Sequence, residues 1–131
     1  VEYSNVRSAV AWQSVFGPHR LSPVCNEWYL FHGTSVEVAK LICSGSFKMS
    51  MAGGHTGTLY GRGTYCCESI TKADEYTQPD GNHERAVILC RALGGKVRYT
   101  DEVVPPDQED LVTSCIEGPY DSVLGDRERC R

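Results

Sequence analysis

The chain has 131 residues and a mass of 14.5 kDa, and we expect residues 1–131 to form a single domain. Hydrophobic residues make up 40% and charged residues 23% of the chain, a composition that excludes a disordered tail. The formal net charge of −4 argues against direct nucleic-acid binding by this domain. Because no apolar run approaches the roughly 20 residues of a membrane span, we expect no membrane partner.

The seven cysteines are an odd number and form no CxxC pair, so paired zinc knuckles are absent from the sequence. Cys66 and Cys67 are adjacent, and on a strand they would point to opposite faces. Cys90 lies in an apolar run, where a thiol behaves as a small hydrophobic group. We expect reduced structural thiols, no metal site and an intracellular protein, nuclear or cytoplasmic. A thiol-dependent enzyme using Cys66 or Cys67 is an alternative, but neither has a basic or helix-start setting.

The first half of the sequence predicts a loop-rich start, one strand, one helix and a long loop. Residues 1–24 contain Gly-Pro and Ser-Pro turn signals. Residues 28–31 are apolar and aromatic and predict a buried strand. Thr34 and Glu37 have the spacing of a capping box, which opens a helix that Gly45 ends. Residues 47–63 are rich in glycine and predict a loop whose length indicates a functional role.

The second half of the sequence predicts further short elements. They are a short strand over 64–67, a helix capped by residues 69–71 and running through 76, a strand over 85–93 with 96–100 as its hairpin partner, a helix over 107–116 behind an Asp cap, and a strand over 120–124. Strands and helices do not follow a βαβ rhythm, so the sequence predicts the α+β class.

One combination of residues points to chemistry. His32-Gly33-Thr34 ends the first predicted strand, Tyr65 follows 33 positions after His32, and Tyr76 lies 11 positions beyond Tyr65. A His-Gly pair at a strand end presents an imidazole beside a bare backbone N–H and C=O, which can hold a carboxamide. Two tyrosines bracketing a short helix can close on a flat aromatic ring from either side. The other histidines lie in polar stretches and are expected to be exposed: His19, His55 and His83.

The segments that carry this pattern resemble the catalytic domain of poly(ADP-ribose) polymerases. They are Leu30-Phe-His-Gly-Thr-Ser35 and Leu59-Tyr-Gly-Arg-Gly-Thr-Tyr-Cys-Cys-Glu-Ser-Ile-Thr-Lys-Ala-Asp-Glu-Tyr76, and the resemblance covers about residues 26–126. It implies the ADP-ribosyltransferase fold, with two antiparallel β-sheets framing a cleft for NAD. It also implies an NAD-dependent protein ADP-ribosyltransferase that releases nicotinamide, with NAD as co-substrate, no metal, and a protein acceptor that can be the protein itself.

The resemblance assigns roles to five residues. His32 and Tyr65 match two members of the family's His-Tyr-Glu catalytic set, and His32 would hydrogen-bond the adenine-ribose 2′-hydroxyl. Gly33 would hold the nicotinamide carboxamide through its backbone, and Thr34 would lie near the adenosine ribose. Tyr65 and Tyr76 would form the walls of the nicotinamide stack, and residues 48–59 would be the loop over the donor site.

The sequence departs from the family in three ways, one of which is that the overlying loop is short and rich in glycine. Ala73 stands where the family has a serine that hydrogen-bonds the carboxamide, which would weaken NAD binding by roughly 1 kcal/mol. The family's glutamate lies on a strand after the equivalent of residues 120–125; Glu128 lies in a segment of alternating charges and is not expected to replace it. We therefore expect the domain to be incomplete at its C-terminus and slow in transfer by itself. A catalytically weak module that binds NAD or a partner is the alternative.

Overall fold

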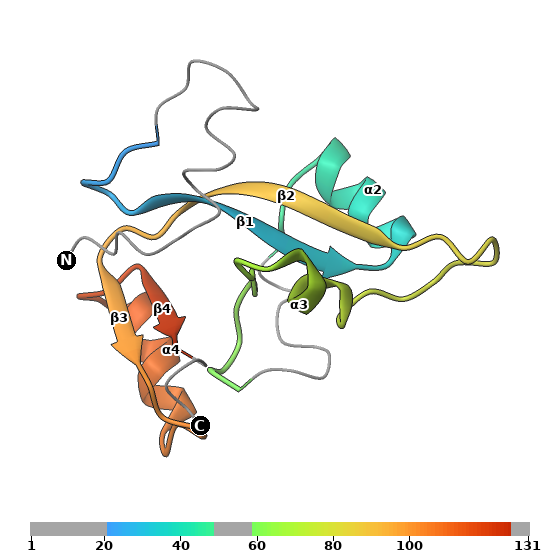
Figure 1. Ribbon diagram of the computed structural model, residues 1–131. Helices are drawn as coiled ribbons and strands as arrows, with labels where there is room; N and C mark the ends of the chain where they lie inside the picture. The colour runs from blue at the N-terminus through green and yellow to red at the C-terminus, as the bar shows by residue number, and fades with distance from the viewer. Residues whose placement is uncertain (1–20, 49–58, 127–131) are drawn as a thin grey trace.

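The computed structural model describes residues 21–48 and 59–126. In chain order the elements are β1 (Glu27–Thr34), α2 (Val36–Ser44), α3 (Ile70–Asp74), β2 (Ala86–Leu93), β3 (Val97–Thr100), α4 (Gln108–Ile116) and β4 (Ser122–Gly125). The strands pair into two small sheets with helices beside them, which agrees with the α+β class (Figure 1). None of the helices in the described ranges is long and apolar enough to cross a membrane.

The first sheet is the antiparallel pair of β1 and β2, in register from Glu27 opposite Leu93 to Thr34 opposite Ala86. It forms because both segments are rich in the β-branched, aliphatic and aromatic residues that pack well on a pleated surface. Trp28, Tyr29 and Phe31 of β1 are buried, as the sequence predicts for this strand. Helix α3 lies against β1, and α2 lies beside β2 (Figure 1).

The second sheet pairs β3 with β4 in parallel, so the expectation of two antiparallel sheets is wrong for this one. The two strands are joined by α4, and a helical crossover is the connection that parallel strands require. The expected hairpin between 85–93 and 96–100 is also wrong. Gly94 and Gly95 donate their N–H groups to the carbonyls of Asn26 and Cys25, and Gly95 has φ +60°, so the chain turns away from β2.

A small apolar cluster joins the two sheets. Trp28 of β1 packs with Val97 of β3, and Leu30 and Leu124 close around them. The Trp28 ring also lies over Gly94, where a Cβ atom would come within 2.6 Å of the ring. The junction therefore needs both a large ring and a residue without a side chain.

Two local expectations are wrong, the cap of α2 and the strand over 64–67, and a third, the cap of α4, is confirmed. Because β1 continues through Thr34, the N-cap of α2 is Ser35, whose hydroxyl accepts from the Val38 N–H at 3.2 Å. The segment over 64–67 is not a strand, since it makes only one bridge, from Cys67 to Phe31. Asp107 caps α4 as expected, accepting from the Asp110 N–H at 2.8 Å.

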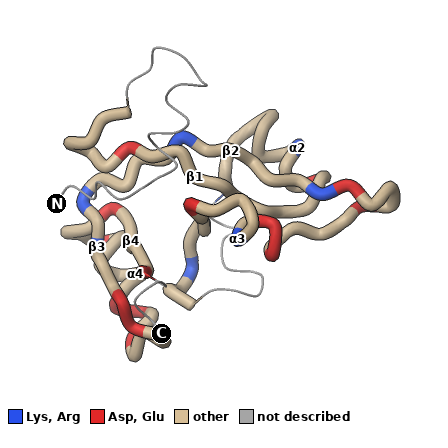
Figure 2. Tube along the Cα trace, in the orientation of Figure 1, with Lys and Arg blue, Asp and Glu red and all other residues tan. Residues whose placement is uncertain are grey.

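Acidic residues gather in the C-terminal part of the fold. Residues 95–126 hold eight acidic side chains and two basic ones, while the whole chain has a net charge of −4. Figure 2 shows these acids around β3, α4 and β4. The remaining part, which contains β1 and β2, is accordingly the more basic part of the chain.

Glu27 gives the first sheet a stability that depends on pH. Its buried carboxylate accepts from the Arg91 guanidinium and, at 2.7 Å, from the Ser22 N–H. The Arg91 hydrogen bond, followed by the Ser22 bond, lowers the pKa of Glu27. A lowered carboxyl pKa stabilises the fold above the usual glutamate value of about 4.3, and this stabilisation is lost as pH falls through the lowered pKa.

We predict that Glu27→Gln lowers the urea midpoint at pH 7 and flattens its decline below about pH 4.5, because the titrating carboxylate is gone. Urea titrations monitored by circular dichroism at several pH values measure this. Glu84→Gln, in the exposed turn before β2, is the matched control and should follow the wild-type profile. A Glu27→Gln profile parallel to wild type would contradict the prediction.

Candidate functional site

The backbone of Gly33 is directed away from β2. Phe31 exchanges two hydrogen bonds with Cys67, at 2.7 and 2.8 Å, and the Asn26 carbonyl accepts from the Gly94 N–H at 2.7 Å. In an antiparallel pair the residues alternate between bonding the partner strand and pointing outward. Gly33 is two residues after Phe31, so its N–H and C=O point to the same outer edge as those of Phe31. This edge carries the backbone N–H and C=O to which the sequence analysis assigns the carboxamide.

The missing side chain of Gly33 makes room for α3. A Cβ atom at Gly33 would lie 1.8 Å from the Ala73 carbonyl oxygen and 2.8 Å from its carbon. Ala73 is completely buried by this packing. Glycine is therefore required here for the approach of two backbones, in addition to any role toward a ligand. Ala73 is consequently a packing residue.

The His32 imidazole is oriented by the backbone of Tyr65. Its Nδ1 lies 2.7 Å from the Tyr65 carbonyl oxygen, and since a carbonyl only accepts, Nδ1 is the donor. The edge of the ring is fixed by Phe47, whose centroid is 5.1 Å away at an interplanar angle of 86°. A neutral imidazole held in this way presents Nε2 as a hydrogen-bond acceptor.

The Tyr65 hydroxyl closes the turn that precedes it. It accepts from the Tyr60 N–H at 2.9 Å and donates to the Gly61 carbonyl at 2.5 Å, and the two tyrosine rings stack at 6.4 Å. Burial raises the pKa of Tyr65 above its ordinary value. The phenol therefore stays protonated at neutral pH and keeps its donor for Gly61.

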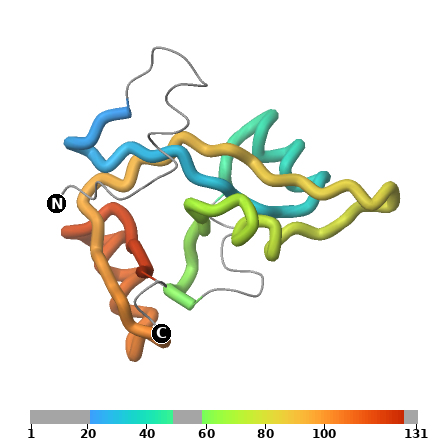
Figure 3. The backbone as a smooth tube through the Cα atoms, viewed as in Figure 1, coloured from blue at the N-terminus to red at the C-terminus, as the bar shows by residue number. Residues whose placement is uncertain are grey.

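The turn at Tyr60 and Gly61 connects the site to the second sheet. A Cβ atom at Gly125 in β4 would lie 2.1 Å from the Tyr60 hydroxyl, and one at Gly61 would lie 2.3 Å from a methyl of Val112 in α4. Gly61 also has φ +87°, which favours glycine. In Figure 3 the segment that starts at Leu59 runs between the two sheets. The turn that binds the Tyr65 hydroxyl therefore contacts both α4 and β4 of the C-terminal part.

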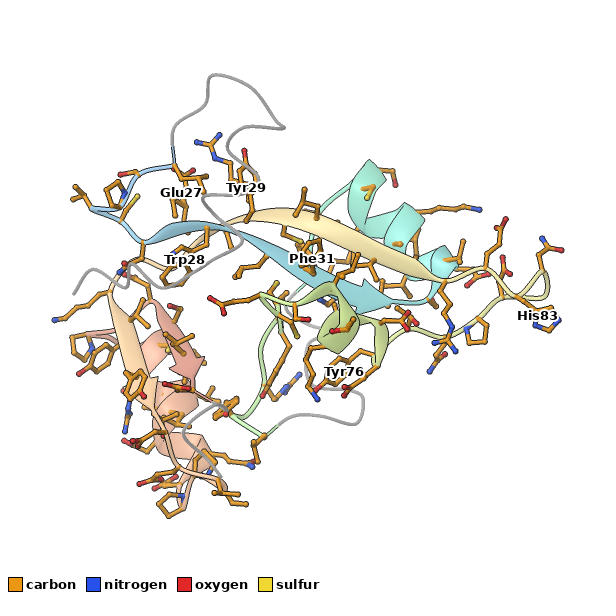
Figure 4. The ribbon with its side chains drawn as sticks, in the orientation of Figure 1. Glu27, Trp28, Tyr29, Phe31, Tyr76 and His83 are labelled. Carbon is orange, nitrogen blue, oxygen red and sulfur yellow. The ribbon has the colours of Figure 1, made fainter. Side chains whose placement is uncertain are left out.

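Tyr76 follows α3 and is half exposed, at 41% (Figure 4). Its N–H donates to the Ala73 carbonyl at 3.1 Å, and the Lys72 ammonium lies 5.7 Å from its ring centroid. The Tyr76 phenol is close enough to Tyr65 to contribute to the raised pKa of Tyr65. The Ala73 carbonyl lies against Gly33 and accepts from the Tyr76 N–H, and the Tyr65 carbonyl lies 2.7 Å from Nδ1 of His32, so these residues lie in one region of the fold.

Cys66 and Cys67 do not form a nucleophilic site. A hydrogen bond with the Cys90 thiol, followed by burial, raises the pKa of Cys66. Burial also raises the pKa of Cys67, against the opposing effect of the Lys72 ammonium. Since a thiolate is the reactive form, neither thiol is activated. The six cysteines of the described residues are free thiols, and this part of the chain contains no group of three metal-binding side chains.

The remaining residues singled out in the sequence lie at the end of β1, in the turn before β2 or outside the described residues. Thr34 is half-buried at the end of β1, opposite Ala86. His83 is exposed at the tip of the turn before β2 (Figure 4). Other expectations concern positions outside the described residues: 1–20 of the predicted loop-rich start, His19, His55, Glu128 and 49–58 of the predicted donor-site loop. The contact of Phe47 with His32 and the stacking of Tyr60 on Tyr65 were not predicted from the sequence. The position of Tyr60 within the glycine-rich motif was the only sequence signal for the Tyr60 contact.

Comparison with known proteins identifies the family. Residues 5–119 match the poly(ADP-ribose) polymerase catalytic domain. The chain is 33% identical over 105 residues to protein mono-ADP-ribosyltransferase PARP12 of Mus musculus, which covers 76% of this chain and 14% of that protein. It is 37% identical over 71 residues to protein mono-ADP-ribosyltransferase PARP10 of Mus musculus, covering 53% of this chain and 7% of that protein. It is 29% identical over 105 residues to poly [ADP-ribose] polymerase tankyrase of Caenorhabditis elegans, covering 78% of this chain and 5% of that protein.

The chain thus spans less than a fifth of the length of these relatives. The matched range includes the His-Gly pair of β1, the glycine-rich turn, both tyrosines and all of β2. These are also the segments that the structure brings together around Gly33. The chain belongs to the poly(ADP-ribose) polymerase catalytic domain family.

Proposed function

We propose that this chain is the NAD-binding part of a protein ADP-ribosyltransferase, which moves ADP-ribose from NAD to a protein acceptor and releases nicotinamide. The observation that carries the proposal is the outward-directed N–H and C=O of Gly33 beside Tyr65 and Tyr76. A carboxamide has one acceptor and one donor in a plane, and the outward-directed N–H and C=O of one residue complement both. The family membership of the chain supports the same reading.

Each residue of the site has a distinct role toward the donor. Gly33 holds the carboxamide, and the rings of Tyr65 and Tyr76 flank the nicotinamide, since aromatic faces bind flat rings. Nε2 of His32 accepts from a ribose hydroxyl, because Nδ1 is already bonded to the Tyr65 carbonyl. Thr34, at the end of the same strand, lies toward the adenosine ribose. Ala73 is completely buried and offers the donor no side chain, so the carboxamide depends on Gly33.

NAD supplies the bond that is broken, between nicotinamide and its ribose. Breaking this bond builds positive charge on the ribose, and a nearby carboxylate stabilises that charge. The residues of this chain act before that step: they orient the nicotinamide and fix the donor's position. Interactions that hold the ground state and the transition state equally lower the KM more than they raise kcat.

We predict that Tyr76→Ala weakens the binding of a benzamide, a nicotinamide analogue, about three- to ten-fold, because one wall of the stack is lost. Isothermal titration of wild type and variant measures the two affinities, and competition by NAD tests whether both ligands share the site.

Tyr99→Ala is the matched control, because Tyr99 is also partly exposed but lies on β3. It should leave the benzamide affinity within twofold of wild type. Equal affinities of wild type and Tyr76→Ala would refute the stacking role. If the folded wild-type chain bound neither benzamide nor NAD, the proposed function would be wrong.

A further inference from the structure

Helix α3, which leads into Tyr76, has little stability of its own. It has five residues, and its N-cap Ser69 makes no side-chain cap bond; the Ser69 hydroxyl lies 2.6 Å from the Thr71 hydroxyl instead. Helices this short do not persist without tertiary contacts, because nucleation costs more than the few hydrogen bonds return. The direction in which Tyr76 leaves α3 is therefore set by the contacts around the helix.

The C-terminal end of α3 is held by a polar cluster of Asp74, Thr77 and Arg85. The Thr77 hydroxyl donates to the Asp74 carbonyl at 2.8 Å and accepts from Nη1 of Arg85 at 2.8 Å. Arg85 also lies 3.9 Å from the Asp74 carboxylate and directly precedes β2. Through the Thr77 hydroxyl, the start of β2 is thus connected to the last turn of α3.

Thr77 also contacts the carboxamide end of the site. Its methyl group lies 3.3 Å from the position that a Cβ atom of Gly33 would occupy. The side chain is buried, with 7% of the residue exposed, although a threonine at a chain turn is commonly exposed. Thr77 therefore touches β1 with its methyl group and Arg85 with its hydroxyl, and it is the residue next to Tyr76 in the chain.

We propose that Thr77, hydrogen-bonded by Arg85, is a positioning residue that fixes the Tyr76 ring over the nicotinamide. The inference rests on the proposed function, since it names what holds one wall of that site. The backbone between Tyr76 and Thr77 is short and has few free torsions, so fixing the Thr77 side chain restricts the approach of the Tyr76 ring. Without the hydroxyl, the half-exposed ring keeps its volume but loses its fixed orientation, and stacking weakens.

The test is a double-mutant cycle on benzamide affinity in the full chain. Thr77→Val removes the hydroxyl and keeps the shape, and we expect roughly three- to ten-fold weaker binding, the effect of one hydrogen bond. Thr77→Ser keeps the hydroxyl and should stay within twofold of wild type. In a Tyr76→Ala background, Thr77→Val should cause no further loss, because the ring that it positions is absent.

Two controls separate positioning from stability. Thr100→Val removes a hydroxyl that accepts from the Glu102 N–H at 3.3 Å at the end of β3, and it should leave the affinity unchanged. Arg85→Met and Arg85→Lys change the other partner of the Thr77 hydrogen bond. The Arg85 side chain is half exposed, so we expect both variants to fold. Arg85→Met should weaken benzamide binding, and Arg85→Lys should restore most of it. Affinities are measured well below the Tm of each variant.

The outcomes are distinct. Wild-type affinity in both Thr77→Val and Arg85→Met would overturn the inference while leaving the proposed function intact. An equal loss for Thr77→Val with and without Tyr76 would also overturn it, because the threonine would then act on the site independently of the ring. Failure of the folded wild-type chain to bind benzamide would refute the proposed function, and this inference with it.

Discussion

Gly33→Ala is expected to remove benzamide binding and to destabilise the fold. The new Cβ atom would lie 1.8 Å from the Ala73 carbonyl oxygen, and since the two nearest atoms both belong to the Ala73 backbone, α3 has to move away from β1. Overpacking of this kind costs roughly 1–3 kcal/mol in unfolding free energy. Displacing α3 also moves Tyr76, so the carboxamide site and the aromatic wall are lost together. Urea unfolding and benzamide titration measure the two effects.

Gly81→Ala is the matched control for this substitution. Gly81 lies in the turn before β2, and among the described residues other than its two chain neighbours no atom lies within 4 Å of the position of an added Cβ. The variant should keep wild-type affinity and a free energy of unfolding within about 0.5 kcal/mol of wild type. A Gly33→Ala protein with unchanged stability and affinity would show that α3 does not pack on β1 as described.

Tyr65→Phe is expected to lower the free energy of unfolding by roughly 1–3 kcal/mol, because the variant loses a donor and an acceptor used by partly buried backbone groups. The Tyr60 N–H and the Gly61 carbonyl, at 2.9 and 2.5 Å from the hydroxyl, would both lose their partner. The phenyl ring remains, so the free energy of benzamide binding should fall by less than the free energy of unfolding. Thermal melts with and without benzamide separate the two contributions.

Tyr120→Phe tests whether any lost tyrosine hydroxyl would have this effect. The Lys96 ammonium and the Arg98 guanidinium lie over the Tyr120 ring, at 5.6 and 6.0 Å from its centroid, and these contacts use the ring face rather than the hydroxyl. Its Tm should therefore stay close to that of wild type. A Tyr65→Phe protein as stable as Tyr120→Phe would contradict a structural role for the Tyr65 hydroxyl.

The two tyrosines of the site illustrate how structural and binding roles are divided. Tyr65 is tied by its hydroxyl to the turn at Tyr60 and Gly61, which in turn packs on α4 and β4. Tyr76 is half exposed and follows a short helix whose placement depends on Gly33 and Thr77. Substitutions at Tyr65 should therefore affect stability first, whereas those at Tyr76 should affect affinity first.

Most elements could be predicted from local sequence, and the sequence also names the candidate site residues. The apolar run 28–31 and the run 86–90 form the paired strands β1 and β2, and the Asp107 cap begins α4 as expected. The spacing of His32, Tyr65 and Tyr76 indicated one site, and the structure places all three around Gly33. These features depend on neighbouring residues or on a motif, both of which a single sequence displays.

Tertiary structure decided the rest. Whether β3 pairs with β2 or β4 depends on Asn26 and Cys25, which bond the Gly94–Gly95 turn from about 70 residues away in the chain. Ser35 rather than Thr34 caps α2 because pairing with Ala86 keeps Thr34 in the strand. Gly33 could be assigned to a ligand from its motif, but its need to admit the Ala73 carbonyl arises only when α3 packs on β1. Such choices depend on partners distant in sequence, and no local pattern records them.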